Sequence, residues 1–314
     1  MEKNEVFYIT RQTILQMFSM MKHIMKCLKG ERRLPYLFVY GTLRYGGKNH
    51  HLLNSARCIY HQCQVSGLLY DTGKGYPVLQ ENTSDWVYGE LYSITEFQLR
   101  EIDQLEGVAG DKPENLFRHV TAPVSNDIGE RYRAFVYTGG HIPHHDSNHI
   151  PSGDWLVYKY LNQNSLLYFA YGSCMDDDRF KKAGVVDYFT NVRGRGVVGG
   201  FEFQFSRKTD DGGKADLIEN NRESVEGKVY EIPLDAIDYL YEREGVHTSS
   251  YRPAIVPVTL NGSVYQSITF IGVSKSAETA PTELYGNEIV RGGNGYLSHA
   301  YLQKIRGKIS RLST

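Results

Sequence analysis

Two stretches of the chain share one pattern, an apolar run that ends in tyrosine and glycine. The first stretch is YLFVYGTL at residues 36–43, and the second is LLYFAYGSCM at residues 166–175. A short apolar run that ends at glycine is typical of a buried strand that leaves its sheet through a tight turn. The pattern therefore predicts two buried strands, each followed by a loop that begins with glycine and a small hydroxylated residue.

The elements after each loop also follow one order. Alternating apolar and polar residues predict strands at 87–94 (VYGELYSI) and 225–232 (VEGKVYEI). Apolar residues at helical spacing predict helices in TEFQLREIDQL at 95–105 and in PLDAIDYLYER at 233–243. The shared order indicates an internal repeat of about 130 residues.

Each predicted helix is followed by a glutamate and then a glycine. The two pairs are Glu106-Gly107 and Glu244-Gly245. Glycine suits the left-handed conformation in which many helices end, so we expect the glutamates at helix C-termini. The negative end of a helix dipole and partial burial would both raise the pKa of such a carboxyl. The glutamates are therefore candidate general bases, and an exposed helix-terminal residue is the alternative for either one taken alone.

The repeat divides the chain into an extension and two domains. Residues 1–34 predict a helix with a broad apolar face that is too short and too charged to span a bilayer. One interpretation is a helix that binds a membrane surface or a partner protein, and the other is a peripheral tail. We expect the first domain at 35–158 and the second at 166–314, with a linker near residues 151–165.

The composition is that of an ordinary soluble globular protein. Hydrophobic residues make up 41% of the chain, and 31 glycines with 24 tyrosines favour strands and turns over a helical bundle. A net charge of −1 provides no field that would attract nucleic acid or an anionic membrane. The four cysteines form no CxxC pair and no secretory signal is evident, so we expect a cytoplasmic protein. Homo-oligomerisation stays open.

Each glycine loop is a candidate anion site. A chain that leaves a strand through Gly-Thr or Gly-Ser can arrange its backbone N–H groups as a nest for a carboxylate or an oxyanion. A tight turn without a ligand is the alternative, but two copies, each followed by a helix-end glutamate, favour pockets. There is no GxSxG elbow and no cofactor fingerprint, so we expect no cofactor. We expect no metal either, because the histidine-rich stretch 141–149 is predicted to be a loop without helical register.

Longer motifs give a more specific indication. YGTLRYGGKNHHLL, VYGELY, DQLEGV and PSGDW resemble the AIG2-like branch of the γ-glutamylcyclotransferase-like family. FAYGSCM, VEGKVY, YEREGV and APTELYGNEIVRGG resemble its γ-glutamylcyclotransferase branch. These motifs together cover nearly all of the chain after residue 34. The resemblance implies an α+β fold made of two tandem small mixed β-barrels with flanking helices.

The resemblance also implies a reaction and its residues. A small γ-glutamyl compound would cyclise to 5-oxoproline when its α-amine attacks its own γ-carbonyl and releases an amine or amino acid. Glu106 and Glu244 would be the catalytic bases. The two loops would hold the substrate through these residues: Tyr40, Gly41, Thr42, Leu43, Arg44, Tyr171, Gly172, Ser173 and Cys174.

Some of these candidates have alternatives. Arg44 either pairs with the substrate carboxylate or lies on the surface. Cys174 stands where the family has asparagine, which removes an amide and leaves the activity of the second domain open. We expect Cys174 to be a packing residue and not a nucleophile, because no histidine has recognisable spacing to it. Four tyrosines are weaker candidates for lining the pockets: Tyr88, Tyr137, Tyr251 and Tyr285.

Three functions fit this pattern. The first is an enzyme that cyclises γ-glutamyl compounds, and a glutamate in both halves favours it. The second is a binding or regulatory module that has the pocket without turnover. The third is an enzyme in which the first domain is the catalyst and the second provides specificity or dimerisation.

Overall fold

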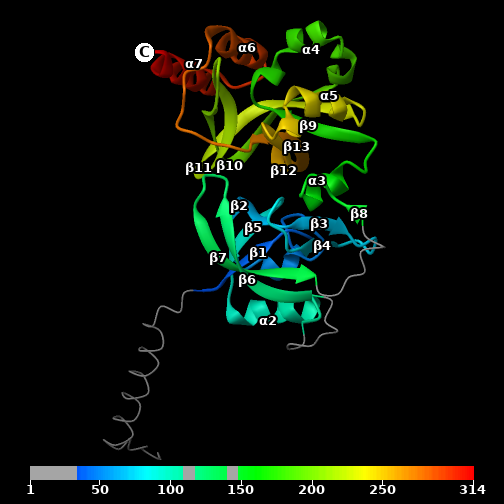
Figure 1. The fold of residues 1–314 in the computed structure, drawn as a ribbon. Helices are drawn as coiled ribbons and strands as arrows, with labels where there is room; N and C mark the ends of the chain where they lie inside the picture. The colour runs from blue at the N-terminus through cyan, green and yellow to red at the C-terminus, as the bar shows by residue number, and fades with distance from the viewer. Residues whose placement is uncertain (1–33, 109–116, 140–147) are drawn as a thin grey trace, which may run out of the picture.

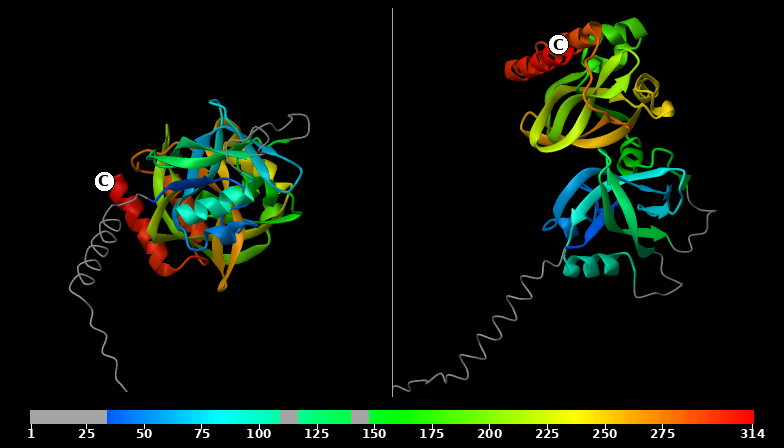
Figure 2. Two further views of the ribbon diagram at one scale, coloured as in Figure 1. Left: turned by 90° about the horizontal axis from the view of Figure 1, so that it is seen from below. Right: turned by 60° about the vertical axis from the view of Figure 1, so that its left-hand side comes forward.

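Two closed β-barrels form most of the computed structural model, which describes residues 34–108, 117–139 and 148–314. Figure 1 shows the barrels stacked, with the second above the first, and the rotated views of Figure 2 agree. The helix predicted within residues 1–34 lies, except for Leu34, outside the described residues. Within those residues, no helix has the length and apolar character needed to cross a membrane.

The first barrel has the strand order β1-β5-β2-β6-β7. Neighbouring strands are antiparallel except β1 and β7, whose parallel pairing closes the barrel. Its strands are β1 Tyr36–Val39, β2 Arg57–Ser66, β5 Trp86–Ser93, β6 Phe117–Asn126 and β7 Arg131–Gly139. A small sheet packs beside it, made of β3 Leu68–Asp71, β4 Pro77–Gln80 and β8 Asn148–His149.

The second barrel repeats this topology. Starting from its first strand, its order is β9-β11-β10-β12-β13, and the parallel pair β9 and β13 closes it. Its strands are β9 Ser165–Ala170, β10 Val192–Thr209, β11 Gly212–Pro233, β12 Tyr251–Leu260 and β13 Ser263–Gly272. The expected fold of two tandem barrels is therefore confirmed, whereas the domain boundaries 35–158 and 166–314 stay a prediction.

The glycine that follows two residues after the valine in VYGELYSI and in VEGKVYEI has the same packing role in both barrels. A Cβ at Gly89 would lie 2.7 Å from the Phe38 ring, and a Cβ at Gly227 would lie 2.6 Å from the Phe169 ring. Both phenylalanines are fully buried on the first strand of their barrel. The glycines therefore leave space for an aromatic side chain in each barrel interior, where packing is dense.

The helices lie mainly at the ends of the molecule. They are α2 Glu96–Leu105, α3 Trp155–Tyr160, α4 Asp177–Ala183, α5 Ala236–Arg243, α6 Glu283–Gly293 and α7 His299–Ser313. Short 3₁₀ turns are η1 His50–Leu53, η2 Ser173–Met175, η3 Val186–Phe189 and η4 Val246–Thr248. Figure 1 shows α2 at the end of the first barrel and α6 and α7 at the opposite end of the second.

The predicted helices form, with one change at a start. A capping box between Thr95 and Gln98 begins α2 where the sequence predicts it. The second helix begins at Ala236 and not at Pro233, because Pro233 still pairs with Ser165 at the end of β11.

The segment predicted as a linker contains a packed helix. Trp155 of α3 belongs to the core of the first barrel, and Val157 belongs to the core of the second. The hydroxyl of Tyr160 donates to the Gln266 carbonyl of the second barrel at 2.8 Å. This helix therefore fixes the barrels against each other, which the polar sequence after it did not indicate.

Deleting residues 1–30 is expected to leave folding and activity unchanged. Both barrels and the pockets described below begin after this segment. Soluble yield, elution volume and turnover of the shortened chain, measured beside the full chain, would check this. Precipitation or loss of turnover would mean that the extension packs on a barrel or completes a site.

Candidate functional site

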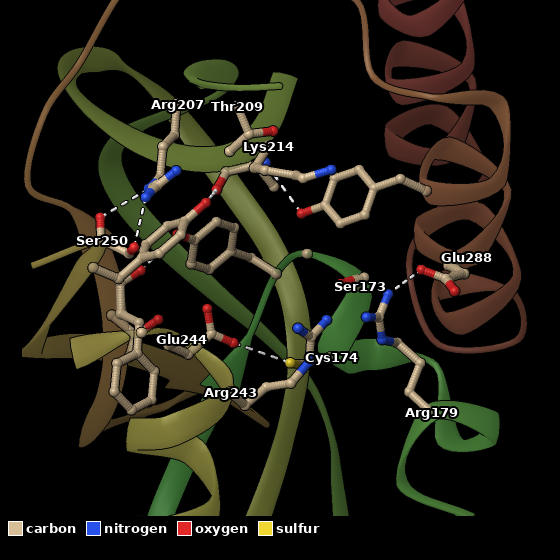
Figure 3. A pocket seen from close by; sticks show the side chains of 18 of the residues that line it. Ser173, Cys174, Arg179, Arg207, Thr209, Lys214, Arg243, Glu244, Ser250 and Glu288 are labelled. Carbon is tan, nitrogen blue, oxygen red and sulfur yellow. Dashed lines mark hydrogen bonds and ion pairs between the residues drawn. The ribbon is translucent and has the colours of Figure 1, made fainter. Parts of the chain in front are cut away.

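A pocket at the glycine loop of the second barrel has a volume of about 450 Å³. Its wall includes the loop Tyr171–Cys174, the end of α5 at Glu244, and residues of β10, β11, β12 and α6. Figure 3 shows Glu244 and Cys174 facing each other, with basic side chains around them. The second glycine loop and its helix-end glutamate therefore meet at one cavity.

Local hydrogen bonds fix the glycine loop. The Met175 N–H donates to the Gly172 carbonyl at 3.1 Å and closes the turn η2 directly after β9. The Tyr171 hydroxyl donates to the Phe270 carbonyl at 2.5 Å, which ties the end of β9 to β13. The tyrosine of the motif therefore holds the strand end in place, while Gly172 and Ser173 line the pocket.

Glu244 caps the C-terminus of α5 as predicted. Its N–H donates to the Leu240 carbonyl at 2.9 Å, and Gly245 has the expected left-handed conformation with φ of 64°. Burial raises the pKa of the Glu244 carboxyl, while Cys174 and Arg243 act in the opposite direction. A carboxyl with a raised pKa is better matched to proton transfer near neutral pH than an ordinary glutamate.

Cys174 is buried beside this carboxyl. Its thiol donates a hydrogen bond to Glu244 Oε1 at 3.1 Å. Burial, together with the neighbouring Glu244 charge, raises the pKa of the thiol to about 12. The thiolate that a nucleophile requires is therefore scarce at neutral pH, and Cys174 acts as a hydrogen-bond donor to Glu244.

Four basic side chains line the second pocket. Arg179 pairs with Glu288, Arg207 donates to Ser250 Oγ at 2.6 Å, and Lys214 pairs with Asp211 at 2.7 Å. Arg243 directly precedes Glu244, and within the described residues its guanidinium has no ion-pair partner. Arg243 is therefore the basic group most available to an anionic ligand.

Two tyrosines line the same cavity. Tyr251 donates to the Ala215 carbonyl at 2.7 Å, and the Ala215 N–H donates to the Tyr285 hydroxyl at 3.1 Å. Both were weaker candidates from the sequence, and both lie in the pocket wall.

The first barrel has the equivalent arrangement around a much smaller cavity. Gly41, Thr42, Leu43 and Glu106 line a pocket of about 30 Å³. Burial raises the pKa of Glu106 to about 7. The cavity is much smaller than the pocket of the second barrel, and none of the described residues that line it is basic.

Two tyrosines also shape this smaller cavity. The Tyr40 hydroxyl donates to the Tyr137 carbonyl at 2.8 Å, in parallel with Tyr171 of the second barrel. Tyr137 donates its own hydroxyl to Asp103 Oδ1 at 2.7 Å. Tyr88, the other candidate, lies elsewhere, at the contact between the barrels.

Arg44 lies away from the first pocket. Its side chain is 2% exposed, with Nη1 at 2.7 Å from Asp154 and Nε at 3.2 Å from Glu90. These two carboxylates outweigh burial and raise the pKa of the guanidinium. Arg44 is therefore neither a surface residue nor a lining residue of the pocket, and we leave it out of the substrate-binding set proposed below.

The histidine-rich stretch is only partly described. His149 lies on β8 beside the Tyr70 ring, while His141, His144 and His145 lie outside the described residues. Across residues 34–108, 117–139 and 148–314, no group of three or more histidine, cysteine or carboxylate side chains is arranged to hold a metal ion.

The sequence did not single out the basic lining of the second pocket. Arg179, Arg207 and Lys214 come from α4, β10 and β11, so nothing local joins them. One signal was available for Arg243, because YEREGV has arginine where DQLEGV has Leu105.

Two family models and several known proteins match parts of the chain. Residues 37–157 match the family model described as "Gamma-glutamyl cyclotransferase, AIG2-like", and residues 224–305 match the model described as "AIG2-like family". YkqA of Bacillus subtilis, whose name assigns it provisionally to the γ-glutamylcyclotransferases, is 39% identical over 88% of this chain and 98% of its own length. The crystal structure of YkqA has a TM-score of 0.79 at 38% identity and covers the same shares of both chains. The γ-L-glutamyl-butirosin B γ-glutamyl cyclotransferase of Niallia circulans is 40% identical over 38% of this chain and 77% of its own length.

Proposed function

Because the chain belongs to the γ-glutamylcyclotransferase-like family, with two AIG2-like domains in tandem, we propose that it cyclises the γ-glutamyl group of a small compound to 5-oxoproline. The observation that carries the proposal is a partly buried glutamate of raised pKa opposite the glycine loop in each barrel. The same pair of features occurs twice on one topology, which favours a shared chemical role over two unrelated turns.

The reaction needs one base and one site for negative charge. Glu244, or Glu106 in the first barrel, takes a proton from the α-ammonium of the substrate. The free amine then attacks the γ-carbonyl carbon of the same molecule, so the nucleophile is already in place. A C–N bond forms within a five-membered ring, and the protonated glutamate gives its proton to the leaving nitrogen as the bond to that nitrogen breaks. The ring nitrogen then loses its second proton to the released amine, so the products are the neutral lactam and an ammonium.

The loop and the basic side chains have separate tasks in this proposal. Backbone N–H groups of the loop stabilise the oxyanion that forms on the γ-carbonyl oxygen. Arg243 binds the α-carboxylate of the substrate in the second barrel, since its guanidinium lines the pocket and forms no ion pair within 4.0 Å in the described chain, and a charged pair of this kind is strong. The first barrel has Leu105 at the equivalent sequence position, so the two barrels are expected to differ in substrate affinity.

A screen for 5-oxoproline release tests the proposal. The full chain is incubated with γ-glutamyl amino acids, γ-glutamylamines and γ-glutamyl peptides, and products are measured by mass spectrometry. The matched control is each compound with an acetylated α-amine, which retains the γ-amide but has no nucleophile. We expect release only from compounds with the free amine. Tight binding of 5-oxoproline without release from any compound would instead identify a binding module.

The rate in the first barrel is expected to depend on pH near neutrality. Only the carboxylate form of Glu106 is a base, and burial raises its pKa to about 7, so activity should increase as the pH rises through about 7. Below that pH, kcat/KM should fall about tenfold per pH unit as Glu106 is protonated. The profile is measured in the Glu244→Gln variant, which isolates the first barrel. An acid limb near pH 4.5, the ordinary value for glutamate, would contradict the assignment.

A further inference from the structure

A third cavity lies between the two barrels and is separate from both barrel pockets. It has a volume of about 320 Å³, within the range typical of small-molecule sites. Its lining comes from β2, β5 and the β6–β7 turn of the first barrel, and from β12 and the end of β13 in the second. Gln62, Tyr88, Asp127, Arg252 and Lys275 provide most of its polar and aromatic wall.

Arg252 provides an unused donor in this cavity. Its side chain is 7% exposed, lies over the Tyr88 ring at 4.1 Å, and donates from Nη2 to Gln62 Oε1 at 2.7 Å. Its Nη1 is buried and has no hydrogen-bond partner among the described residues. A buried guanidinium donor without an acceptor is costly, so an acceptor from a ligand would stabilise it.

Asp127 provides the matching acceptor from the other barrel. Neither of its carboxylate oxygens has a hydrogen-bond partner within the described chain, and both are buried. Lys275 Nζ lies 3.4 Å from Asp127 Oδ2, but it already donates to Asp216 Oδ2 at 2.8 Å and to the Leu217 carbonyl at 3.1 Å. Asp127 Oδ1 therefore remains available to a donor.

The two unused groups do not satisfy each other. In the part of the chain that the structure describes, no ion pair within 4.0 Å involves Arg252. Arg252 and Lys275 face Asp127 and Asp216, and the Glu219 carboxyl also acts on Arg252 and Asp127, so charges of both signs surround the cavity. A net-neutral occupant that carries both charges suits such a wall better than a single anion or cation, because it adds no net charge to a buried site.

We propose that the cavity between the barrels binds a small zwitterion of the α-amino acid type, with its carboxylate on Arg252 Nη1 and its ammonium on Asp127 Oδ1. The pairing gives each buried charge a partner of opposite sign and a charge-assisted hydrogen bond. A cavity of this volume accommodates the backbone and side chain of such a ligand.

Calorimetric titration of the full chain with separate probes tests the charge requirement. The probes are glycine, L-alanine, L-serine and L-glutamate, with propionate and ethylamine as analogues of alanine that carry one charge each. We expect saturable binding of at least one amino acid, and at least about tenfold weaker binding of both analogues. No binding of any amino acid up to about 10 mM would overturn the proposal and indicate that the cavity contains only water.

Three variants locate the bound molecule, because a zwitterion could also enter the second barrel pocket. Asp127→Asn and Arg252→Lys are expected to weaken binding at least about tenfold. Lysine is expected to bind less well because it has no planar guanidinium that could donate to Gln62 and to the ligand at the same time. Arg243→Met removes the cation proposed to hold a carboxylate in the second barrel pocket, and it should bind the amino acid as the parent does. Retained binding in both cavity variants, or loss in Arg243→Met alone, would place the ligand in the barrel pocket and overturn the proposal. A crystal of the parent chain soaked in the amino acid keeps the test decisive if a variant misfolds, since density between the barrels is expected.

Discussion

Replacing Glu244 with glutamine is expected to lower 5-oxoproline release by the second barrel by a factor of about 10²–10⁴, the usual cost of losing a general base. Glutamine has nearly the same size and can still accept the hydrogen bond from Cys174. Its amide cannot take the ammonium proton. The fall should therefore be in kcat, with ligand affinity changed far less, because the loop and Arg243 are proposed to hold the substrate.

Glu106→Gln should have the same effect on the first barrel, and the double variant should be inactive while folded. Two controls match these changes in chemistry and position. Glu101→Gln alters an exposed residue of α2, and Asp238→Asn alters an exposed residue of α5, and neither lines a pocket. Parent rates in Glu106→Gln, Glu244→Gln and the double variant, on a confirmed substrate, would show that neither glutamate is the base.

Arg44→Met is expected to lower the free energy of unfolding by about 3–5 kcal/mol, the typical cost of removing one partner from a buried ion pair. The change leaves Glu90 and Asp154 buried without their cation. Asp154 also caps α3 by accepting from Leu156 N–H at 2.8 Å, so the defect should extend to the helix between the barrels.

Urea denaturation followed by tryptophan fluorescence measures this loss. The two tryptophans of the chain are Trp86 on β5 and Trp155 on α3, so the signal reports on the first barrel and its junction. Arg118→Met is the control, because it breaks an exposed pair with Glu81 that should contribute no more than about 1 kcal/mol. Equal urea midpoints for the two variants would contradict the structural role assigned to Arg44.

The local pattern of the sequence was sufficient for the elements and their repetition. Alternating apolar and polar residues predicted β5 and the part of β11 at residues 225–232. Helical spacing with a following glycine predicted α2 and α5, each with a glutamate at its C-terminus. These features depend on residues within one or two turns of each other, so they can be inferred without knowing the tertiary contacts.

Features that depend on distant residues could not be inferred in this way. Arg44 pairs with Glu90 and Asp154, which are 46 and 110 residues away, and nothing near Arg44 distinguishes that partnership from a ligand contact. The different sizes of the two barrel pockets have the same origin, because their walls come from several strands and helices. Sequence patterns give the identity of each side chain but not the volume left between them.

The parallel strand pairs that close the barrels determine when each half can finish folding during synthesis. β1 closes on β7, so the first barrel has all its strands once Gly139 has left the ribosome, before Ser165 begins the second. Because domains tend to fold as they emerge, the first barrel can complete its sheet without offering open strand edges to its later copy. Asp127 and Gln62, however, have no partners at that stage, because Lys275 and Arg252 are synthesised more than a hundred residues later. A nascent chain stalled between the barrels would therefore carry a finished barrel with an uncovered polar face.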